Sequence, residues 1–247
     1  MLEAKAVTKS FGSLVAVNNV SLAVAPGELR AIIGPNGAGK TTFFNMITGF
    51  FPPSSGEIVV EGRDITRLTA QQRVELGMAR TFQITEIFPE LTARENVCIA
   101  VEVASGYRLR PWLSRAARTR VRERIDEIIA SAGLTKQADR RVGELSHGDQ
   151  RAAEIAMALA LKPRILLLDE PTAGMGEQET FHVASLIRRL HKHSGYTIVL
   201  IEHDMRVVFN LADRITVLDQ GSLLAEGTPT EIADNPAVQS AYLGSAK

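Results

Sequence analysis

Apolar residues along the chain gather in short runs that glycine, proline and charged residues separate. The runs at 29–33, 165–168 and 197–201 are dominated by aliphatic side chains and show no alternation with polar ones. Short strands of this kind are typical of a parallel sheet that is covered on both faces. Alternation at 21–24, which ends at the turn dipeptide Pro26-Gly27, predicts an earlier strand, and we expect further strands at 57–60, 215–218 and 222–225.

Helical spacing dominates the middle of the chain. Residues 93–162 are rich in Ala, Arg, Glu and Leu, and Val121, Ile125, Ile128 and Ile129 recur at helical intervals. Other helices are predicted at 40–49, where a glycine closes the segment, and at 178–191 and 204–211. The pattern predicts one domain over 1–247, with an α/β core at 1–85 and 163–247 and an inserted helical subdomain at 86–162.

Composition narrows the classes of protein that fit this pattern. The 28 basic and 28 acidic residues cancel, so nothing in the overall charge favours nucleic acid. A single cysteine excludes an intramolecular disulfide. The first residues lack the apolar stretch of a signal peptide, and no run approaches the roughly 18 apolar residues of a membrane span. We therefore expect a cytosolic protein, or one attached to a membrane through the helices of a partner.

A glycine-rich loop lies between the predicted strand at 29–33 and the predicted helix at 40–49. Its sequence, Gly34-Pro35-Asn36-Gly37-Ala38-Gly39-Lys40-Thr41, matches the P-loop pattern of nucleotide-binding proteins. Glycines let backbone N–H groups turn toward a phosphate, and the helix start adds its positive dipole end. We expect Lys40 to reach the β- and γ-phosphates of ATP, the Thr41 hydroxyl to ligate Mg²⁺, and Thr42 to belong to the same nucleotide-binding set. The loop alone does not separate kinases, GTPases and motors.

Two carboxylates and a histidine follow predicted core strands. Asp169 and Glu170 come directly after the run at 165–168, and His203 comes soon after the run at 197–201. Strand ends of an open α/β sheet are where ligands bind. We expect Asp169 to hold Mg²⁺, Glu170 to polarise the attacking water as a general base, and His203 to contact the γ-phosphate or orient the water. His182, His191 and His193 are expected to be solvated on or after a helix.

A second possible anion site precedes the predicted helix at 150–161. Ser146 and Gly148 offer a hydroxyl and backbone N–H groups at a helix start. The segment is either a plain N-cap or a cap for the nucleotide held by a second subunit. One chain with one ATP has little use for two phosphate-binding helix starts, whereas two facing chains would use both.

At this point the chain resembles the ATP-binding subunits of ABC transporters along nearly its whole length. The resemblance implies that Phe11 stacks on adenine, that 34–41 is the Walker A loop, and that Gln83 touches Mg²⁺ and faces the membrane subunit. It further implies that 145–150 is the family signature, with 165–170 as the Walker B strand and His203 as the switch histidine. The implied fold is a P-loop NTPase core with a parallel sheet, an antiparallel β subdomain and an inserted α-helical subdomain.

More narrowly, five segments look like the branched-chain amino-acid importer subfamily, and urea importers are close relatives. These segments are residues 77–83, 91–97, 154–156, 173–175 and 201–205. The resemblance implies two permease subunits, a second ATPase subunit that is either related or identical, and indirectly a substrate-binding protein. It places the chain at the cytoplasmic face of the plasma membrane and implies no nucleic-acid partner.

The chain departs from the family pattern at three positions. The usual signature reads Leu-Ser-Gly-Gly-Gln, so His147 and Asp149 differ, while Ser146 and Gly148 are kept. Asp149 adds negative charge near a triphosphate. Where many relatives carry an aspartate that communicates across the dimer, this chain has Gly176.

Two other functions and one further surface stay open. A non-transport ABC ATPase that acts on nucleic acid or the ribosome usually carries two cassettes, a coiled coil or a basic surface, none of which the sequence shows. A small-molecule P-loop kinase would leave the segment at 145–150 unexplained. The stretch 108–124 contains seven arginines and one glutamate. It is either a solvated helix face or a surface for anionic headgroups or a partner.

Overall fold

A six-stranded sheet forms the centre of the protein. The computed structural model describes residues 1–81, 87–105 and 115–244. Five strands run parallel and one edge strand runs antiparallel, in the order β10-β9-β3-β8-β7-β6. Their bounds are β3 (Leu29–Ile33), β6 (Met78–Thr81), β7 (Ile165–Asp169), β8 (Thr197–Ile201), β9 (Arg214–Asp219) and β10 (Ser222–Gly227). The parallel sheet that the apolar runs predict is confirmed.

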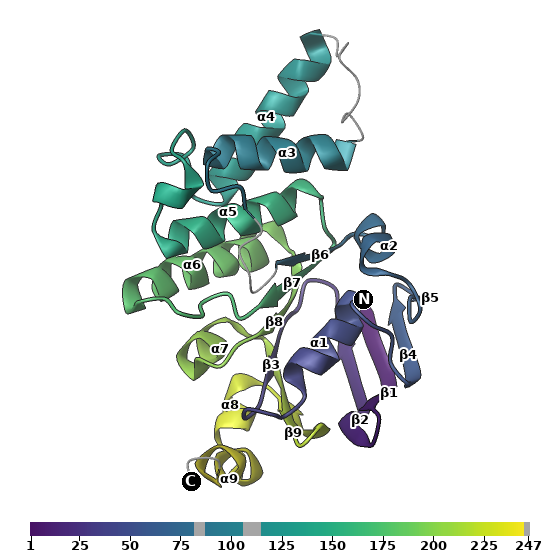
Figure 1. Ribbon diagram of the computed structural model, residues 1–247. Coiled ribbons are helices and arrows are strands. Elements are labelled where there is room, and N and C mark those ends of the chain that lie inside the picture. Colours follow the sequence, from purple (N-terminus) through teal and green to yellow (C-terminus); the bar gives the residue numbers. More distant parts are fainter. Residues whose placement is uncertain (82–86, 106–114, 245–247) are drawn as a thin grey trace.

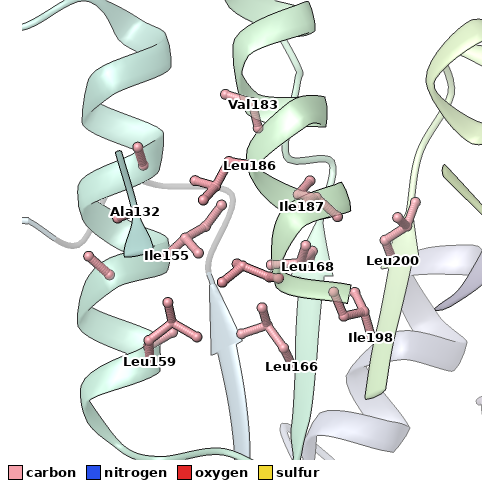
Figure 2. Close-up of a cluster of buried hydrophobic side chains, with 14 of the residues drawn as sticks. Ala132, Ile155, Leu159, Leu166, Leu168, Val183, Leu186, Ile187, Ile198 and Leu200 are labelled. Carbon is pink, nitrogen blue, oxygen red and sulfur yellow. The ribbon is translucent and has the colours of Figure 1, made fainter. Parts of the chain in front are cut away.

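Both faces of this sheet are covered, which explains why its strands lack alternation. Leu166 and Leu168 pack in one buried cluster with side chains of the helices α5 (His147–Ala160) and α6 (Glu177–Ser194), as Figure 2 shows. Ile165 and Leu167 point to the opposite face, into a cluster that includes Phe43 of α1 (Lys40–Thr48). Each apolar residue of β7 is therefore buried on one side or the other.

The N-terminal region forms a separate antiparallel sheet of four strands. Their order is β2 (Leu14–Val24), β1 (Leu2–Phe11), β4 (Ser55–Val60) and β5 (Arg63–Asp64). The buried face of this sheet packs in one apolar cluster with side chains of α1. The short helix α2 (Ala70–Glu75) contributes the buried Arg73, whose guanidinium donates to the carbonyls of Met46 and Ile47 at the end of α1. Arg73 thereby satisfies carbonyls that have no partner within the helix.

Helices α3 (Ala93–Ser105) and α4 (Arg115–Ser131) lie beyond α5 and pack against it (Figure 1). A short 3₁₀ turn, Val142–Glu144, leads into α5. The remaining helices are α7 (Met205–Leu211), α8 (Pro229–Ala233) and α9 (Pro236–Gly244), and α9 lies at the end of the molecule opposite α4 (Figure 1). Among the described residues, no helix has the length and apolar character to cross a membrane.

Two local expectations differ from the structure. Helix α5 begins at His147, three residues before the predicted start at Gln150, because Ser146 acts as its N-cap and the glycine that follows is tolerated in the first turn. His191 is buried and not solvated: its Nε2 lies 2.8 Å from Oδ2 of Asp213. The histidine falls on the apolar stripe of α6, next to the buried Leu190 and four residues after the buried Ile187.

Candidate functional site

The glycine-rich loop joins the end of β3 to the start of α1. Gly34, Gly37 and Gly39 have φ values of 152°, 81° and 90°, a region that side-chain-bearing residues rarely adopt. A Cβ on Gly34 would lie 2.1 Å from the carbonyl oxygen of Leu218, and one on Gly39 would lie 2.5 Å from that of Ala16. A Cβ on Gly37 would meet no atom within 4 Å. Two of the glycines are thus required by packing, while Gly37 faces open space.

The loop borders a pocket of about 490 Å³. One wall is formed by Leu14, Val15 and Ala16 at the start of β2, which the sequence analysis did not single out. A hydrogen bond of 3.2 Å from the Gly221 N–H to the Ala38 carbonyl fixes the turn after β9 against the loop. The remaining lining residues are Asn36, Gly37, Ala38, Gly39, Lys40, Thr41, Thr42, Glu170, Gln220 and Gly221. Most of the predicted phosphate-binding residues therefore share one pocket, and Gly34 and Pro35 lie behind it.

The ammonium group of Lys40 is held inside this loop. Its Nζ donates hydrogen bonds of 2.6 Å and 3.0 Å to the carbonyls of Gly34 and Pro35. Burial lowers the pKa of Lys40, and the negative charge of Glu170 opposes that shift. The two groups therefore interact electrostatically across the pocket.

Asp169 ends β7 as a buried carboxylate with one oxygen in use. Its Oδ2 accepts a hydrogen bond of 2.7 Å from Arg80 at Nη2, while Nη1 of Arg80 donates to Asn45 and Thr48 of α1. The other oxygen, Oδ1, is buried and has no hydrogen-bond partner within the described part of the chain. A buried oxygen of this kind is costly unless a ligand satisfies it. Asp169 Oδ1 and the Thr41 hydroxyl are oxygen donors of the kind that Mg²⁺ prefers, so these residues fit the ion.

Glu170 follows Asp169 in a strained backbone conformation. Its φ is 43°, which is uncommon for a residue with a side chain. The Glu170 N–H donates a hydrogen bond of 3.0 Å to the carbonyl of Ile201, and its own carbonyl accepts one from Ala173. The residue lines the phosphate-loop pocket and also a second pocket of about 310 Å³ that His147, Gln150 and Met175 help to form. Strain of this kind is often found at functional sites.

His203 sits on a turn that the buried Glu202 organises. Glu202 is fully buried and accepts hydrogen bonds from the Thr172 hydroxyl, from the Thr172 N–H at 3.1 Å and from the His203 N–H at 2.8 Å. The imidazole is 63% exposed, and its Nδ1 lies 3.5 Å from Glu202 Oε2. Glu202 was not predicted from the sequence. The available signal was a carboxylate directly after a buried, mostly aliphatic strand and next to the candidate histidine.

Ser146 and Gly148 form the start of α5, as expected for a capped helix. The Ser146 hydroxyl accepts a hydrogen bond of 3.2 Å from the Asp149 N–H. The Gly148 N–H donates a weaker one of 3.4 Å to Glu179 on α6, a residue that the sequence analysis also missed. Asp149 lies 3.6 Å from His182, also on α6. In the single chain this helix start thus contacts one carboxylate and one histidine of α6, Glu179 and His182.

The described structure does not place every predicted residue in the pocket: His203, Asp169, Ser146 and Gly148 do not line it, and neither does Phe11. The ring of Phe11 is 48% exposed and packs edge-on against Phe51 at 5.6 Å between centroids, and it is absent from the pocket lining. Lys9 lies 5.3 Å from the centre of the Phe11 ring. Gln83 lies outside the described residues. The roles of Phe11 and Gln83 stay predictions.

Comparison with known proteins adds to this geometry. The model of the ABC transporter family matches residues 17–173, and that of the branched-chain amino acid ATP-binding cassette transporter matches residues 222–247. The chain is 43% identical over its whole length to the high-affinity branched-chain amino acid transport ATP-binding protein LivG of Salmonella typhimurium, of which it covers 98%.

Solved structures that resemble this chain are also ATP-binding cassettes, at lower sequence identity. The ADP conformation of an ATP-binding cassette of an ABC transporter is 30% identical, with a TM-score of 0.85, covering 99% of this chain and 98% of that one. A dimeric post-hydrolysis cassette bound to ADP and phosphate is 30% identical, with a TM-score of 0.75, covering 93% and 99%. The phosphate-loop pocket, the buried strand that ends in two carboxylates and the capped start of α5 are therefore parts of one known architecture, and the chain belongs to the ABC transporter family of ATP-binding, ATP-hydrolysing subunits.

Proposed function

We propose that this chain hydrolyses ATP as the motor subunit of an importer for branched-chain amino acids or related small polar solutes. The observation that carries the proposal is the position of Glu170. Glu170 lines both the phosphate-loop pocket and the pocket beside the start of α5. Its neighbour Asp169 carries a buried carboxylate oxygen that has no hydrogen-bond partner in the described structure. A carboxylate placed beside a phosphate site can accept the proton of an attacking water.

Each group of residues around the pocket has a separate role in ATP hydrolysis. Backbone N–H groups of 34–41 and the Lys40 ammonium hold the phosphates, and the pocket wall at Leu14 and Val15 offers apolar surface to the base. Thr41 and Asp169 would hold Mg²⁺, which when bound neutralises charge on the β- and γ-phosphates. Glu170 receives the proton of the water, and His203, on the turn that Glu202 fixes, contacts the γ-phosphate side of the site.

Pairing of two such subunits supplies the other half of each nucleotide site. The start of α5, with the Ser146 hydroxyl and the Gly148 N–H, offers a phosphate-binding helix terminus that the chain's own pocket does not use. The proposal is that this terminus caps the nucleotide of a second ATPase subunit, related or identical. The existence of a dimeric cassette of the same architecture supports this arrangement.

A large apolar groove is the proposed contact for the permease. It has a volume of about 480 Å³ and lies between α2, β6, α3 and α5. Phe50, Val74 and Val103 on its rim are exposed, with 70%, 37% and 46% of each residue accessible. Exposed apolar surface of this kind marks interaction sites. Arg80, which binds Asp169, also lines the groove, so a permease helix seated there would lie one side chain away from the hydrolytic strand.

The cargo and the location follow from the relatives and remain part of the proposal. The match of residues 222–247 to the branched-chain amino acid transporter model and the 43% identity to LivG support an amino-acid importer. We infer a peripheral position at the cytoplasmic face of the plasma membrane, with two permease subunits as direct partners. A substrate-binding protein would deliver the cargo to them.

The test is the substitution Glu170→Gln in the purified chain. Hydrolysis of ATP should fall by about 10² to 10⁴, because a general base contributes that much. ATP binding should persist, and an ATP-dependent dimer should accumulate in size-exclusion chromatography. The matched control is Glu90→Gln, which removes a carboxylate that is 86% exposed and should leave turnover unchanged. Full turnover in Glu170→Gln would refute the proposed role of this carboxylate.

A further inference from the structure

The first half of α4 concentrates positive charge where its own helix disfavours it. Between Arg115 and Arg124 the helix carries five arginines and one glutamate. Arg118 and Arg122, like Arg120 and Arg124, are spaced i,i+4, a spacing at which like charges repel. Cations near a helix N-terminus also oppose the helix dipole. The arrangement therefore destabilises the isolated helix.

Four of the five arginine side chains form no ion pair in the described structure that would offset this repulsion. Within the described part of the chain, the guanidinium groups of Arg115, Arg118, Arg120 and Arg122 have no ion pair or hydrogen bond. Of these five arginines, Arg124 alone has such contacts with described residues, to Glu127 and to the carbonyl of Leu159. The second half of the same helix is acidic and is paired: Asp126 binds Arg94 of α3. Charge on α4 is thus separated into a satisfied acidic half and an unsatisfied basic half.

The basic half borders a pocket of about 250 Å³ between α3, α4 and the end of α5. Apolar side chains form about half of its lining, from Val101, Ala104, Ala117 and Val121 among others. Among the described residues that line it, Arg120, Arg124 and Lys162 are charged and none is a carboxylate. Apolar side chains beside cationic ones suit an amphiphilic anion, whose phosphate meets the cations while its apolar part meets the apolar side chains.

The pocket also lies beside the groove proposed for the permease. Leu161 lines both cavities, and α3 contributes to both, with Val103 in the groove and Ala104 in the pocket. The arginine-bearing end of α4 projects past α3, at the end of the molecule opposite α9 (Figure 1). If the groove receives a membrane subunit, as the proposed function requires, the basic end of α4 lies on the membrane side.

We propose that this pocket, together with the exposed arginines of α4, binds the phosphate headgroups of anionic phospholipids at the membrane surface. The inference rests on the proposed function for the direction in which the surface faces. Its chemistry rests on the unpaired guanidinium groups and the cation-lined pocket. Contact with lipid would supply the counter-charges that the first half of α4 lacks.

The experiment is co-sedimentation of the purified full-length chain, without nucleotide, with vesicles of two compositions. One is phosphatidylcholine alone, and the other is an equal mixture of phosphatidylcholine and phosphatidylglycerol. We expect binding to the anionic vesicles only, and loss of binding at about 1 M salt, where the screening length falls to about 3 Å. Equal binding to both compositions, or no binding at low salt, would overturn the proposal.

Two sets of variants test the residues. Arg118→Gln/Arg120→Gln/Arg122→Gln should weaken vesicle binding about a hundredfold, at about fivefold for each arginine near an anionic surface. The matched control, Arg63→Gln/Arg67→Gln/Arg189→Gln, removes the same charge from exposed positions elsewhere and should keep the parent affinity. Equal losses in both triple variants would show an unspecific charge effect and sink the assigned site.

A second pair separates the pocket from diffuse attraction. Ala104→Trp places a bulky ring at the pocket wall without changing charge and should weaken binding several-fold. Ala116→Trp, at an exposed position of α4 outside the lining, should not weaken it. An unaltered affinity in Ala104→Trp would remove the pocket from the proposal.

The source of the phosphate is tested by competition at constant ionic strength. Displacement of bound vesicles by glycerol 3-phosphate supports recognition of a headgroup phosphate. Binding of inorganic phosphate or of a short RNA in the absence of vesicle binding would instead identify a soluble anion as the ligand and overturn the lipid assignment. The vesicle assay needs neither ATP nor permease. Absence of vesicle binding would therefore leave the proposed ATP hydrolysis untouched, and full turnover in Glu170→Gln would not affect the interpretation of the vesicle assay.

Discussion

The guanidinium group of Arg151 donates a hydrogen bond of 2.6 Å to the backbone carbonyl of Asp169. The first turns of α5 are thereby tied to the end of β7, where the two carboxylates of the site begin. Arg151 also forms a buried ion pair with Glu154, one turn further along α5. Glu154 lines both the permease groove and the pocket beside Glu170. A buried charge pair therefore spans the distance between the proposed partner surface and the hydrolytic strand.

Arg151→Ala should lower the free energy of unfolding by about 3–5 kcal/mol, because it leaves the buried Glu154 carboxylate without its partner. Denaturant unfolding followed by circular dichroism measures this loss. The matched control is Arg164→Ala, which breaks an exposed pair with Glu61 and should cost about 0–1 kcal/mol. Similar losses in the two variants would show that breaking the buried pair of Arg151 and Glu154 costs no more than breaking an exposed pair.

The glycines of the phosphate loop should separate into two classes. Gly34→Ala should destabilise the fold by about 1–3 kcal/mol or more, because its Cβ would meet the Leu218 carbonyl at 2.1 Å. Gly37→Ala has open space around its Cβ, so its cost should be limited to backbone strain of about 1 kcal/mol. Thermal unfolding of the nucleotide-free chain compares them. An equal loss at both positions would contradict the packing argument.

The sequence was most informative where function and packing are local. The apolar runs at 165–168 and 197–201 predict buried strands because both of their faces are covered, and the loop at 34–41 is recognisable because its glycines are close in sequence. Contacts between distant segments were not predictable in the same way. Arg80 reaches Asp169 across 89 positions of sequence, and Glu202 reaches Thr172 across 30. No periodicity encodes such pairs.

The burial of His191 shows where pattern reasoning could have gone further. Its position follows the apolar stripe of α6, which also contains Val183 and Ile187. Histidine is polar enough to be read as solvated, but at this register it faces the core and needs a partner there. The partner, Asp213, belongs to the connection after α7, so its identity depends on the tertiary fold.

Asp213 gives a prediction about pH. Burial raises the pKa of this carboxyl. Hydrogen bonds from the Leu29 N–H and Lys192, with the charges of His191 and Lys192, lower it by more, so the net pKa lies below its usual value. A depressed carboxylate pKa contributes stability above the unfolded value, and this contribution is lost as the pH falls through the folded value. Asp213→Asn should therefore be less stable than the parent at neutral pH.

The loss in Asp213→Asn should be about 1.5–3 kcal/mol at neutral pH, the usual value for a hydrogen bond to a charged group. It should shrink as the pH falls below about 4, where the parent carboxyl also takes up a proton. Urea unfolding at a series of pH values measures both. Asp234→Asn, which changes a carboxylate with no hydrogen bond from its side chain in the described structure, serves as the control. A stability difference that does not vary between neutral and acid pH would contradict the assigned charge effect.

Glu179 gives the last prediction, on pairing of two chains. Its carboxylate accepts hydrogen bonds from the Gly148 N–H at 3.4 Å and from the Gly176 N–H at 3.3 Å. It therefore occupies an amide at the helix start that the proposed pairing assigns to the partner's γ-phosphate. Glu179→Gln keeps an oxygen that can accept these bonds but removes the negative charge.

We expect Glu179→Gln to strengthen ATP-dependent pairing about fivefold, because removal of one like charge near a phosphate is worth about 1 kcal/mol in water. The variant is combined with Glu170→Gln so that the ATP-bound dimer persists, and pairing is measured by analytical ultracentrifugation over a range of chain concentrations. Glu177→Gln, in the same helical turn but 86% exposed, is the matched control and should change pairing little. If Glu179→Gln instead weakened pairing, the carboxylate would be an organiser of the helix start, and the start of α5 would need Glu179 in order to receive its phosphate.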